Sequence, residues 1–262
     1  MSATIRHELL VEDAIEARAY QLSALDHCLS GSTLLVLPTG MGKTPIEVMV
    51  IAERLRAGGG RAIMLAPTNA LVNQHLDDLR KMLKISIEDE IVGLTGSTLP
   101  IKRKEIWKNS KVIVATPQVV RNDVEKNVTN LADVSVLVVD EAHRATGKHA
   151  MAQVGDLYAE QNPEGLVVAA TASPGHLEVE INEVCNRLRI VNIHARPPGD
   201  ALLAPYATGL EINDVVVEVP EELRDMVKPL EIWLSRIIDR LRRLGFYTRS
   251  GHVTAGGLQE AQ

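Results

Sequence analysis

The most chemically informative feature is a glycine-rich segment, residues 37–44, that reads Leu-Pro-Thr-Gly-Met-Gly-Lys-Thr and follows a short apolar run. Gly40 and Gly42 let backbone amides converge on phosphate oxygens where a helix begins. Lys43 can neutralise charge on the β- and γ-phosphates, and Thr44 can offer its hydroxyl to Mg²⁺. The usual phosphate-loop motif has a glycine where Leu37 stands, so the strict motif is not met. A plain glycine-rich turn is the alternative. Strand, loop and helix in this order favour a phosphate-binding loop.

A pair of carboxylates follows another apolar run farther along the chain. Val134–Val139 is almost entirely β-branched and apolar, which is typical of a central parallel strand covered on both faces. Asp140 and Glu141 come next, and ligands of open α/β sheets bind at the carboxyl ends of strands. We expect Asp140 to hold Mg²⁺ and Glu141 to orient or deprotonate the attacking water. A solvated acidic turn is the alternative, but the loop upstream favours a site that binds and hydrolyses ATP.

Three polar side chains near these strand ends are candidates for sensing the γ-phosphate. Thr171 and Ser173 follow the apolar run Leu166–Ala170, and His143 lies just after the acidic pair. We expect the two hydroxyls to hydrogen-bond to the Asp-Glu-Ala-His segment and the histidine to link the two segments. Threonine and serine at a strand end are also ordinary turn formers.

These segments together resemble the first motor domain of superfamily 2 helicases of the DEAH type, over roughly residues 12–220. The resemblance implies a RecA-like P-loop domain that binds ATP with Mg²⁺. It makes the segment Arg18-Ala-Tyr-Gln21 the element that reads adenine, because the amide of Gln21 matches the donor–acceptor edge of that base. Tyr20 is then a packing neighbour. The predicted ATP contacts are Arg18, Gln21, Thr39, Gly40, Met41, Gly42, Lys43 and Thr44, the predicted catalytic residues are Lys43, Asp140 and Glu141, and the predicted metal ligands are Thr44 and Asp140.

Three further segments, 66–74, 95–96 and 115–118, resemble the family's strand-gripping motifs. The implied DNA-binding residues are Pro67, Thr68, Thr95, Gly96, Thr116 and Pro117. The combination of Ala-Thr-Pro-Gln, Asp-Glu-Ala-His-Arg-Ala and Thr-Ala-Ser-Pro-Gly is similar to the archaeal Hef helicases and the Fanconi anaemia group M helicases. This narrower resemblance implies a DNA-repair helicase that remodels branched or forked DNA.

The composition is that of an ordinary globular protein. The 262 residues are 45% hydrophobic and 24% charged, with a formal net charge of −6. The negative charge argues against a simple basic nucleic-acid-binding module, but motors of this kind grip the sugar-phosphate backbone largely with amides, hydroxyls and helix N-termini. A local basic stretch is expected to be a solvated helix face, with phosphate contact as the alternative. It comprises Lys102, Arg103, Lys104 and Lys108.

The sequence shows no sign of a membrane or secretory role. No apolar run approaches the roughly 20 residues that span a bilayer, and the N-terminus lacks the hydrophobic region of a signal peptide. Cys28 and Cys185 form no metal-ligand pattern and suggest a reducing interior. We therefore expect a cytoplasmic protein without a membrane partner.

Strand-like runs alternate with helix-like segments, which predicts βαβ units and a mostly parallel sheet flanked by helices. The expected strands are 33–37, 62–66, 91–94, 112–115, 134–139 and 166–170. The expected helices include 44–56, 69–84, 101–108 and 177–188. Pro45 fits the first turn of the first of these helices, and Gly58-Gly59-Gly60 ends it. Pro197–Asp200 marks a turn or a boundary.

Three parts are expected along the chain. Residues 1–210 form the RecA-like ATP-binding domain, 211–250 an exit strand and the beginning of a helical insertion, and 251–262 a flexible tail. Between Glu221 and Gly245 apolar residues recur at three-to-four spacing, a stripe that is more often buried in a core than part of a site. A proline within this stretch, at position 229, predicts a kinked or restarted helix.

A complete helicase of this kind has a second RecA-like domain whose arginine finger completes the ATP site. Nothing after Gly175 supplies such motifs, so the resemblance implies a fragment, a split gene product or a truncated relative that works with a second lobe. Two alternatives stay open. One is a lobe of a related RNA sensor or restriction-type translocase, and the other is a non-catalytic, nucleotide-gated adaptor that binds nucleic acid. The intact Lys43, Asp140 and Glu141 favour chemistry, whereas the absent lobe favours the adaptor.

Overall fold

The computed structural model describes residues 3–58, 60–85, 91–173, 178–206 and 220–246. The chain forms two compact units, Met1–Thr208 and Gly209–Gln262. The first unit is an α/β domain built on a seven-stranded sheet, and the second contributes one long helix to the described residues. Every functional residue predicted above lies in the first unit, which is called the lobe below.

The sheet of the lobe is parallel throughout. Its strands pair in the order β3-β4-β2-β5-β6-β1-β7. The six strands expected from the sequence are confirmed to within one residue at each end, and β7 is an additional edge strand. The strands are β1 (Thr33–Val36), β2 (Arg61–Leu65), β3 (Ile91–Leu94), β4 (Val112–Ala115), β5 (Val134–Asp140), β6 (Leu166–Thr171) and β7 (Asn192–Ala195).

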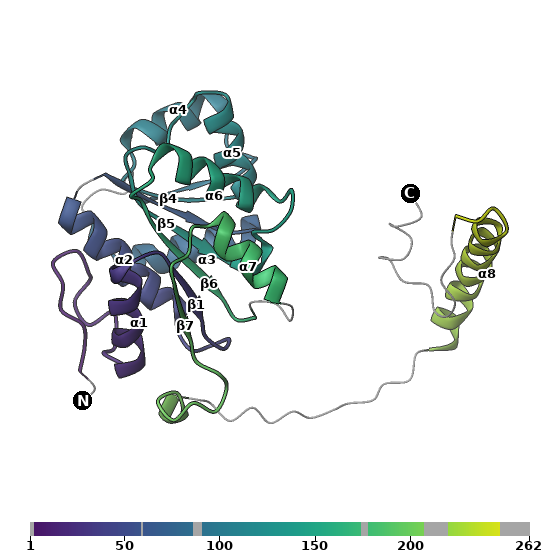
Figure 1. Ribbon diagram of the computed structural model, residues 1–262, viewed down its shortest axis with the longest axis horizontal. Coiled ribbons are helices and arrows are strands. Elements are labelled where there is room, and N and C mark those ends of the chain that lie inside the picture. The colour runs from purple at the N-terminus through teal and green to yellow at the C-terminus, as the bar shows by residue number, and fades with distance from the viewer. Residues whose placement is uncertain (1–2, 59, 86–90, 174–177, 207–219, 247–262) are drawn as a thin grey trace. The chain divides into compact units, whose positions relative to one another are not determined.

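Helices cover both faces of this sheet, as Figure 1 shows. Helices α1, α2 and α3 share a hydrophobic cluster on one face, and α4 to α7 share a second cluster on the other. The helices are α1 (Ala19–Ser30), α2 (Lys43–Gly58), α3 (Asn69–Met82), α4 (Pro100–Asn109), α5 (Pro117–Glu125), α6 (Ala150–Gln161) and α7 (Glu178–Arg187). Short 3₁₀ turns are η2 (Ala142–Arg144) and η3 (Ala204–Tyr206).

The central strand β5 shows why the strand runs are almost entirely apolar. Val136 and Val138 face the α1–α3 cluster, and Leu137 and Val139 face the α4–α7 cluster. Successive side chains of a strand point to opposite faces, so a strand covered on both sides buries nearly every residue, and Ser135 near its start is the half-buried exception. The expectation of a doubly covered parallel sheet is confirmed.

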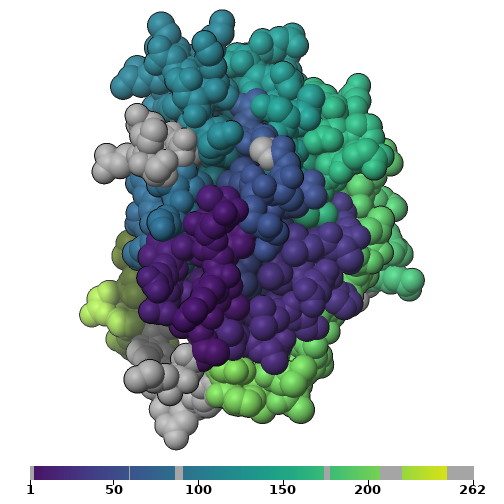
Figure 2. Space-filling model, turned by 90° about the vertical axis from the view of Figure 1, so that its left-hand side faces the viewer, coloured from purple at the N-terminus to yellow at the C-terminus, as the bar shows by residue number. Residues whose placement is uncertain are grey.

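The N-terminal residues before α1 pack against the C-terminal end of α3. The Val11 amide donates to the Met82 carbonyl at 2.9 Å, and the Lys84 amide donates to Leu9 at the same distance. Leu10 is buried in the core. Figure 2 shows this purple segment at the surface beside the blue α2 and α3 region.

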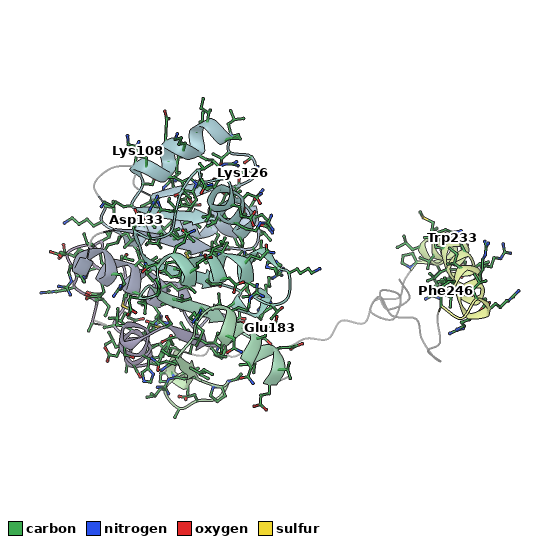
Figure 3. All side chains as sticks on the ribbon, turned by 45° about the horizontal axis from the view of Figure 1, so that its top comes forward. Lys108, Lys126, Asp133, Glu183, Trp233 and Phe246 are labelled. Atoms are coloured by element: carbon green, nitrogen blue, oxygen red, sulfur yellow. The ribbon has the colours of Figure 1, made fainter. Side chains whose placement is uncertain are left out.

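The second unit contributes α8, Glu221–Arg243. The helix continues through Pro229, so the predicted restart is wrong. Within the second unit the described residues leave most of the apolar stripe uncovered: Met226 is 70% exposed and Trp233 63%, while Ile238 is buried. The expectation that the stripe packs in a core stays a prediction. Figure 3 labels Trp233 on this helix. The predicted exit strand and tail lie outside the described residues, and none of the helices in the described part of the chain is long and apolar enough to cross a membrane.

A buried network of polar and charged side chains joins α4 to α5. The Asp123 carboxylate is fully buried, lies 3.1 Å from Arg103 Nε and accepts a 2.9 Å hydrogen bond from Trp107 Nε1. The predicted solvated basic face is therefore right for Lys102, Lys104 and Lys108, which are exposed, and wrong for Arg103. Figure 3 shows Lys108 on α4. Arg103 serves the fold because it compensates a buried charge.

We expect Arg103→Ala to lower the free energy of unfolding by about 3–5 kcal/mol, because it leaves the Asp123 carboxylate buried without its cation. Lys104→Ala, a matched change one residue away on the exposed face, should stay within about 0.5 kcal/mol of the wild type. Chemical denaturation of the three proteins measures both effects. Equal stabilities of the two variants would contradict the assigned role of Arg103.

Candidate nucleotide and nucleic-acid site

The strand order separates the predicted site residues into two neighbouring groups. The carboxyl ends of β1, β5 and β6, which are adjacent strands, carry the phosphate loop, the acidic pair and Thr171. The segments after β3, β4 and β2, also adjacent, carry the three predicted strand-gripping motifs. Since all strands are parallel, both groups lie at the same edge of the sheet, where ligands of such sheets bind.

The phosphate loop has the backbone that its sequence predicts. Gly40 and Gly42 adopt φ angles of 80° and 68°, a left-handed region that favours glycine. Helix α2 begins at Lys43, whose Nζ donates a 3.2 Å hydrogen bond to the Leu37 carbonyl. A Cβ added at Gly40 would meet nothing within 4 Å, so the loop is open on that side. The helix N-terminus and the lysine are thus placed to receive an anion.

The predicted adenine-reading element is tied directly to this loop. Tyr20 Oη donates to the Met41 carbonyl at 2.8 Å, and Gln21 Nε2 donates to the Gly42 carbonyl at 3.1 Å. Both side chains are buried. Tyr20 is therefore more than the packing neighbour expected from the sequence, because its hydroxyl fixes the loop.

The acidic pair ends β5 as expected, and its first member has a partner that the sequence did not reveal. Asp140 is 7% exposed, and its Oδ2 lies 2.8 Å from His75 Nε2 on α3. Glu141 adopts a left-handed backbone, with φ 53° and ψ 45°. Such a conformation is uncommon for a residue with a side chain, and it turns the chain sharply between the strand and η2.

A buried glutamate lies in the same region. Glu47 on α2 is fully buried, and neither of its carboxylate oxygens has a hydrogen-bond partner among the described residues. Burial raises its pKa to about 7, and the negative charges of Asp140 and Glu141 add to this, while His75 and Lys43 oppose it. The same surroundings raise the pKa of His75. Burial alone would lower this pKa, but the hydrogen bond to Asp140 and the negative charge of Glu47 outweigh the effect of burial.

His75 and Glu47 are the functional candidates that sequence reasoning missed. Each is a polar residue inside an apolar stripe: His75 lies between Val72 and Leu79 on the buried face of α3, and Glu47 follows Ile46 on α2. A charged residue on a buried helix face is rarely tolerated without a partner. A polar residue within an apolar helix face was therefore the sequence signal that could have identified His75 and Glu47.

The predicted coupling residues contact one another. His143 Nδ1 lies 3.1 Å from Thr171 Oγ1 and 3.3 Å from a Glu141 carboxylate oxygen. Ser173 contacts Thr171 through its backbone, with its amide donating to Thr171 Oγ1 at 3.1 Å, so the expected hydroxyl contact with the Asp-Glu-Ala-His segment is made by Thr171. The segments after β5 and β6 are therefore joined through side chains next to the acidic pair. The Pro-Gly that completes the second segment, residues 174–175, lies outside the described residues.

The three predicted DNA-binding segments are also joined at the sheet edge. The Ala66 amide donates to Ala115 at 3.0 Å, and the Thr116 amide donates to Leu94 at 3.1 Å. Thr68 caps α3 by accepting from the Leu71 amide at 3.2 Å. Pro117 begins α5. Pro67, Thr95 and Gly96 lie at the same strand ends. Thr68 and Gly96 are exposed there, whereas Thr116 and Pro117 are buried, so the structure leaves only part of the predicted set accessible to a ligand.

The oxygen donors at this edge suit Mg²⁺. No group of three or more His, Cys, Asp or Glu side chains in the described part of the chain could hold a metal ion by itself. Mg²⁺ is usually held by one or two protein oxygens and takes its other ligands from phosphates and water. The hydroxyl of Thr44 in the first turn of α2 and the buried carboxylate of Asp140 fit that requirement.

A hollow of about 860 Å³ lies at the opposite edge of the sheet. It is bounded by Ser32 and Leu166, at the amino ends of β1 and β6, by Arg54 of α2 and by Arg189. Ligands of parallel sheets bind at the carboxyl edge. The phosphate-loop edge is therefore the candidate site.

Comparison with known proteins agrees with this geometry. A family model described as DEAD/DEAH box helicase matches residues 18–180. The chain belongs to this family, whose members bind and hydrolyse ATP. The crystal structure of the Pyrococcus furiosus Hef helicase domain superposes with a TM-score of 0.75 and 37% sequence identity, over 97% of this chain and 54% of that one. The fold is thus the RecA-like fold of a helicase motor domain.

Two relatives support the same assignment. A Methanocaldococcus jannaschii protein, provisionally named an ATP-dependent RNA helicase, is 34% identical over 98% of this chain and 32% of its own length. The Drosophila melanogaster DEAD-box ATP-dependent DNA helicase Fancm is 33% identical over 91% of this chain and 16% of its own. The chain therefore spans about a third or less of these relatives.

The surroundings of Glu47 predict an unusual pH dependence of stability. The folded protein keeps a proton on Glu47 up to about pH 7, whereas the unfolded chain releases it near its ordinary pKa of 4.5. The contribution of Glu47 to the free energy of unfolding therefore falls as the pH rises through this window. Relative to the wild type, Glu47→Gln should gain about 3 kcal/mol between about pH 4.5 and about pH 8.

Urea denaturation without nucleotide or metal, repeated across that range, measures this difference. Glu160→Gln, at an exposed position on α6, is the matched control and should keep a constant offset from the wild type. Parallel pH profiles for the wild type and Glu47→Gln would show that Glu47 is not held protonated.

Proposed function

We propose that this chain is the ATP-binding motor lobe of a helicase or translocase that acts on branched or forked DNA in repair. In this proposal ATP binds with Mg²⁺ at the edge formed by β1, β5 and β6, and DNA binds at the edge formed by β2, β3 and β4. A second RecA-like lobe completes the ATP site. The domain limits of 1–210 and 211–250 and the cytoplasmic location stay predictions.

The observation that carries this proposal is the shared sheet edge. The phosphate loop and Asp140 follow strands that flank β6, so triphosphate and metal ligands converge from two sides. The DNA-binding segments follow the next three strands along the same edge. His143 and Thr171 join the segments after β5 and β6 at 3.1 Å, beside the acidic pair.

The chemistry assigned to the chain is positioning and electrostatic stabilisation. Loop amides and Lys43 bind the phosphates, and Glu141 orients the attacking water and accepts its proton. When bound, Mg²⁺ would neutralise part of the phosphate charge. Asp140, fixed by His75, and Thr44 would hold it. Closure and reopening of the cleft between two lobes would move the pair along a strand.

DNA is favoured over RNA by the relatives with the narrower names. The Fancm relative is named a DNA helicase, and the Hef domain is the structural neighbour, although the Methanocaldococcus relative is provisionally named an RNA helicase. Contacts through Thr68, Thr95 and Gly96, which are not buried, would reach phosphate and sugar, so affinity should depend on salt more than on base sequence.

Binding of Mg²⁺-ATP to the isolated chain is the first test. Lys43→Ala should raise the Kd roughly 100-fold, or about 3 kcal/mol, because a charged partner of the phosphates is lost. Lys81→Ala on the exposed side of α3 is the matched lysine control and should bind as the wild type does. Isothermal titration calorimetry measures all three. Equal affinity of the wild type and Lys43→Ala would refute the assignment of the loop.

Phosphate release is the second test. The chain alone should hydrolyse ATP negligibly, since an arginine finger from the second lobe contributes roughly 10³–10⁵ in rate in related hydrolases. Joining it to a Hef-type second lobe should produce turnover that forked DNA stimulates. Glu141→Gln should abolish that turnover and leave ATP binding nearly intact, because it removes the proton acceptor and no phosphate ligand. Brisk DNA-stimulated hydrolysis by the monomeric chain alone would contradict the proposal that a second lobe completes the ATP site.

A further inference from the structure

The segment that follows β7 is folded back onto the lobe and carries an aromatic side chain, Tyr206. Arg196 and Asp200 form an ion pair at 3.1 Å, and the Leu202 amide donates to the Asp200 carboxylate at 2.8 Å. Leu203 is 2% exposed and belongs to the α1–α3 hydrophobic cluster. The short turn η3 then brings Tyr206 against the same cluster. The predicted turn at Pro197–Asp200 is thus the start of an ordered segment.

Tyr206 contacts the predicted adenine-reading element. The guanidinium carbon of Arg18 lies 4.7 Å from the centroid of the Tyr206 ring, and the rings of Tyr20 and Tyr206 are 5.4 Å apart and inclined by 57°. Arg18 Nε also donates to Glu16 at 2.9 Å, and an Arg18 Nη donates to Tyr20 Oη at 3.4 Å. Three side chains therefore fix the plane of one guanidinium.

This cluster is connected to the phosphate loop. The same Tyr20 hydroxyl that accepts from Arg18 donates to the Met41 carbonyl, and Gln21 donates to Gly42. The side chain of Arg18 is 29% exposed, so part of it stays accessible. A planar cation that rests on an aromatic ring can stack its other face on a heterocyclic base.

We propose that Tyr206 is a positioning residue for base recognition. Its ring packs against one face of the Arg18 guanidinium, so that Arg18 presents the other face as a fixed cationic plane to the purine of the nucleotide. The inference rests on the proposed binding of ATP. It adds a residue from the far end of the lobe, after β7, to the site formed by the segments before and after β1. Its effect is expected to fall on the base, because the ring contacts of Tyr206 are with Arg18 and Tyr20 of the predicted adenine-reading element.

The test compares a ligand that has a base with one that has none. For the wild type, Tyr206→Ala and Tyr206→Phe, we would measure the Kd of Mg²⁺-ATP and of Mg²⁺-tripolyphosphate by calorimetry. Tyr206→Ala should weaken ATP binding about five-fold, the scale of a partly exposed cation–π contact, and leave tripolyphosphate binding unchanged. Tyr206→Phe keeps the ring and should restore wild-type affinity for ATP. Leu202→Ala, on the same segment and 46% exposed, is the matched control and should not change either Kd.

The outcomes separate this inference from the function on which it depends. Failure of the wild type to bind ATP would overturn both. Normal ATP binding by the wild type with an unchanged Kd in Tyr206→Ala, or an equal loss for ATP and tripolyphosphate, would overturn the role of Tyr206 alone. If the alanine variant does not fold, Tyr206→Leu, which keeps apolar bulk against the core without an aromatic face, replaces it and carries the same expectations.

Discussion

The parallel direction of every strand in the sheet is the constraint on which the candidate site depends. A parallel sheet gathers the carboxyl ends of its strands at one edge, so segments distant in sequence become neighbours there. The phosphate loop after β1 and Asp140 after β5 are separated only by β6, or about 10 Å at the usual strand spacing. That separation suits a phosphate chain held at one end by a loop and at the other by a metal ligand.

The features that the sequence predicted correctly are those encoded over a few consecutive residues. Doubly covered strands read as unbroken apolar runs, and the loop needs glycines at fixed offsets, so both appear in any short window. The contacts of His75 with Asp140 and of Tyr206 with Arg18 join residues that are far apart in the chain, and they depend on which helix covers which strand. The apolar stripe on α8 is a third case: its spacing correctly predicts a helix, but the spacing alone does not identify the surface that covers the stripe.

The lobe treats its buried charges differently in two places. Between α4 and α5, one carboxylate oxygen of Asp123 pairs with Arg103 and accepts from Trp107, and this links the two helices. At the nucleotide edge, Glu47 is buried without a hydrogen-bond partner among the described residues, and Glu141 has a strained backbone. Both features cost stability, and such costs commonly gather where ligands bind, since groups arranged for a ligand are not arranged for each other.

The charge at this edge supports the proposal that a second lobe completes the ATP site. Mg²⁺ leaves ATP with a net negative charge, and Lys43 is the cation that the phosphate loop itself supplies. Asp140 and Glu141 add negative charge to the same region, and their fields help to raise the pKa of Glu47 to about 7. Charge that develops on the γ-phosphate during transfer therefore needs a further cation aimed at the reacting oxygens, and stabilisation of this kind is worth most in a site closed to water. Since the edge of a single lobe is open on the side of Gly40, a second lobe would meet both requirements at once, because it would bring the cation and exclude the solvent.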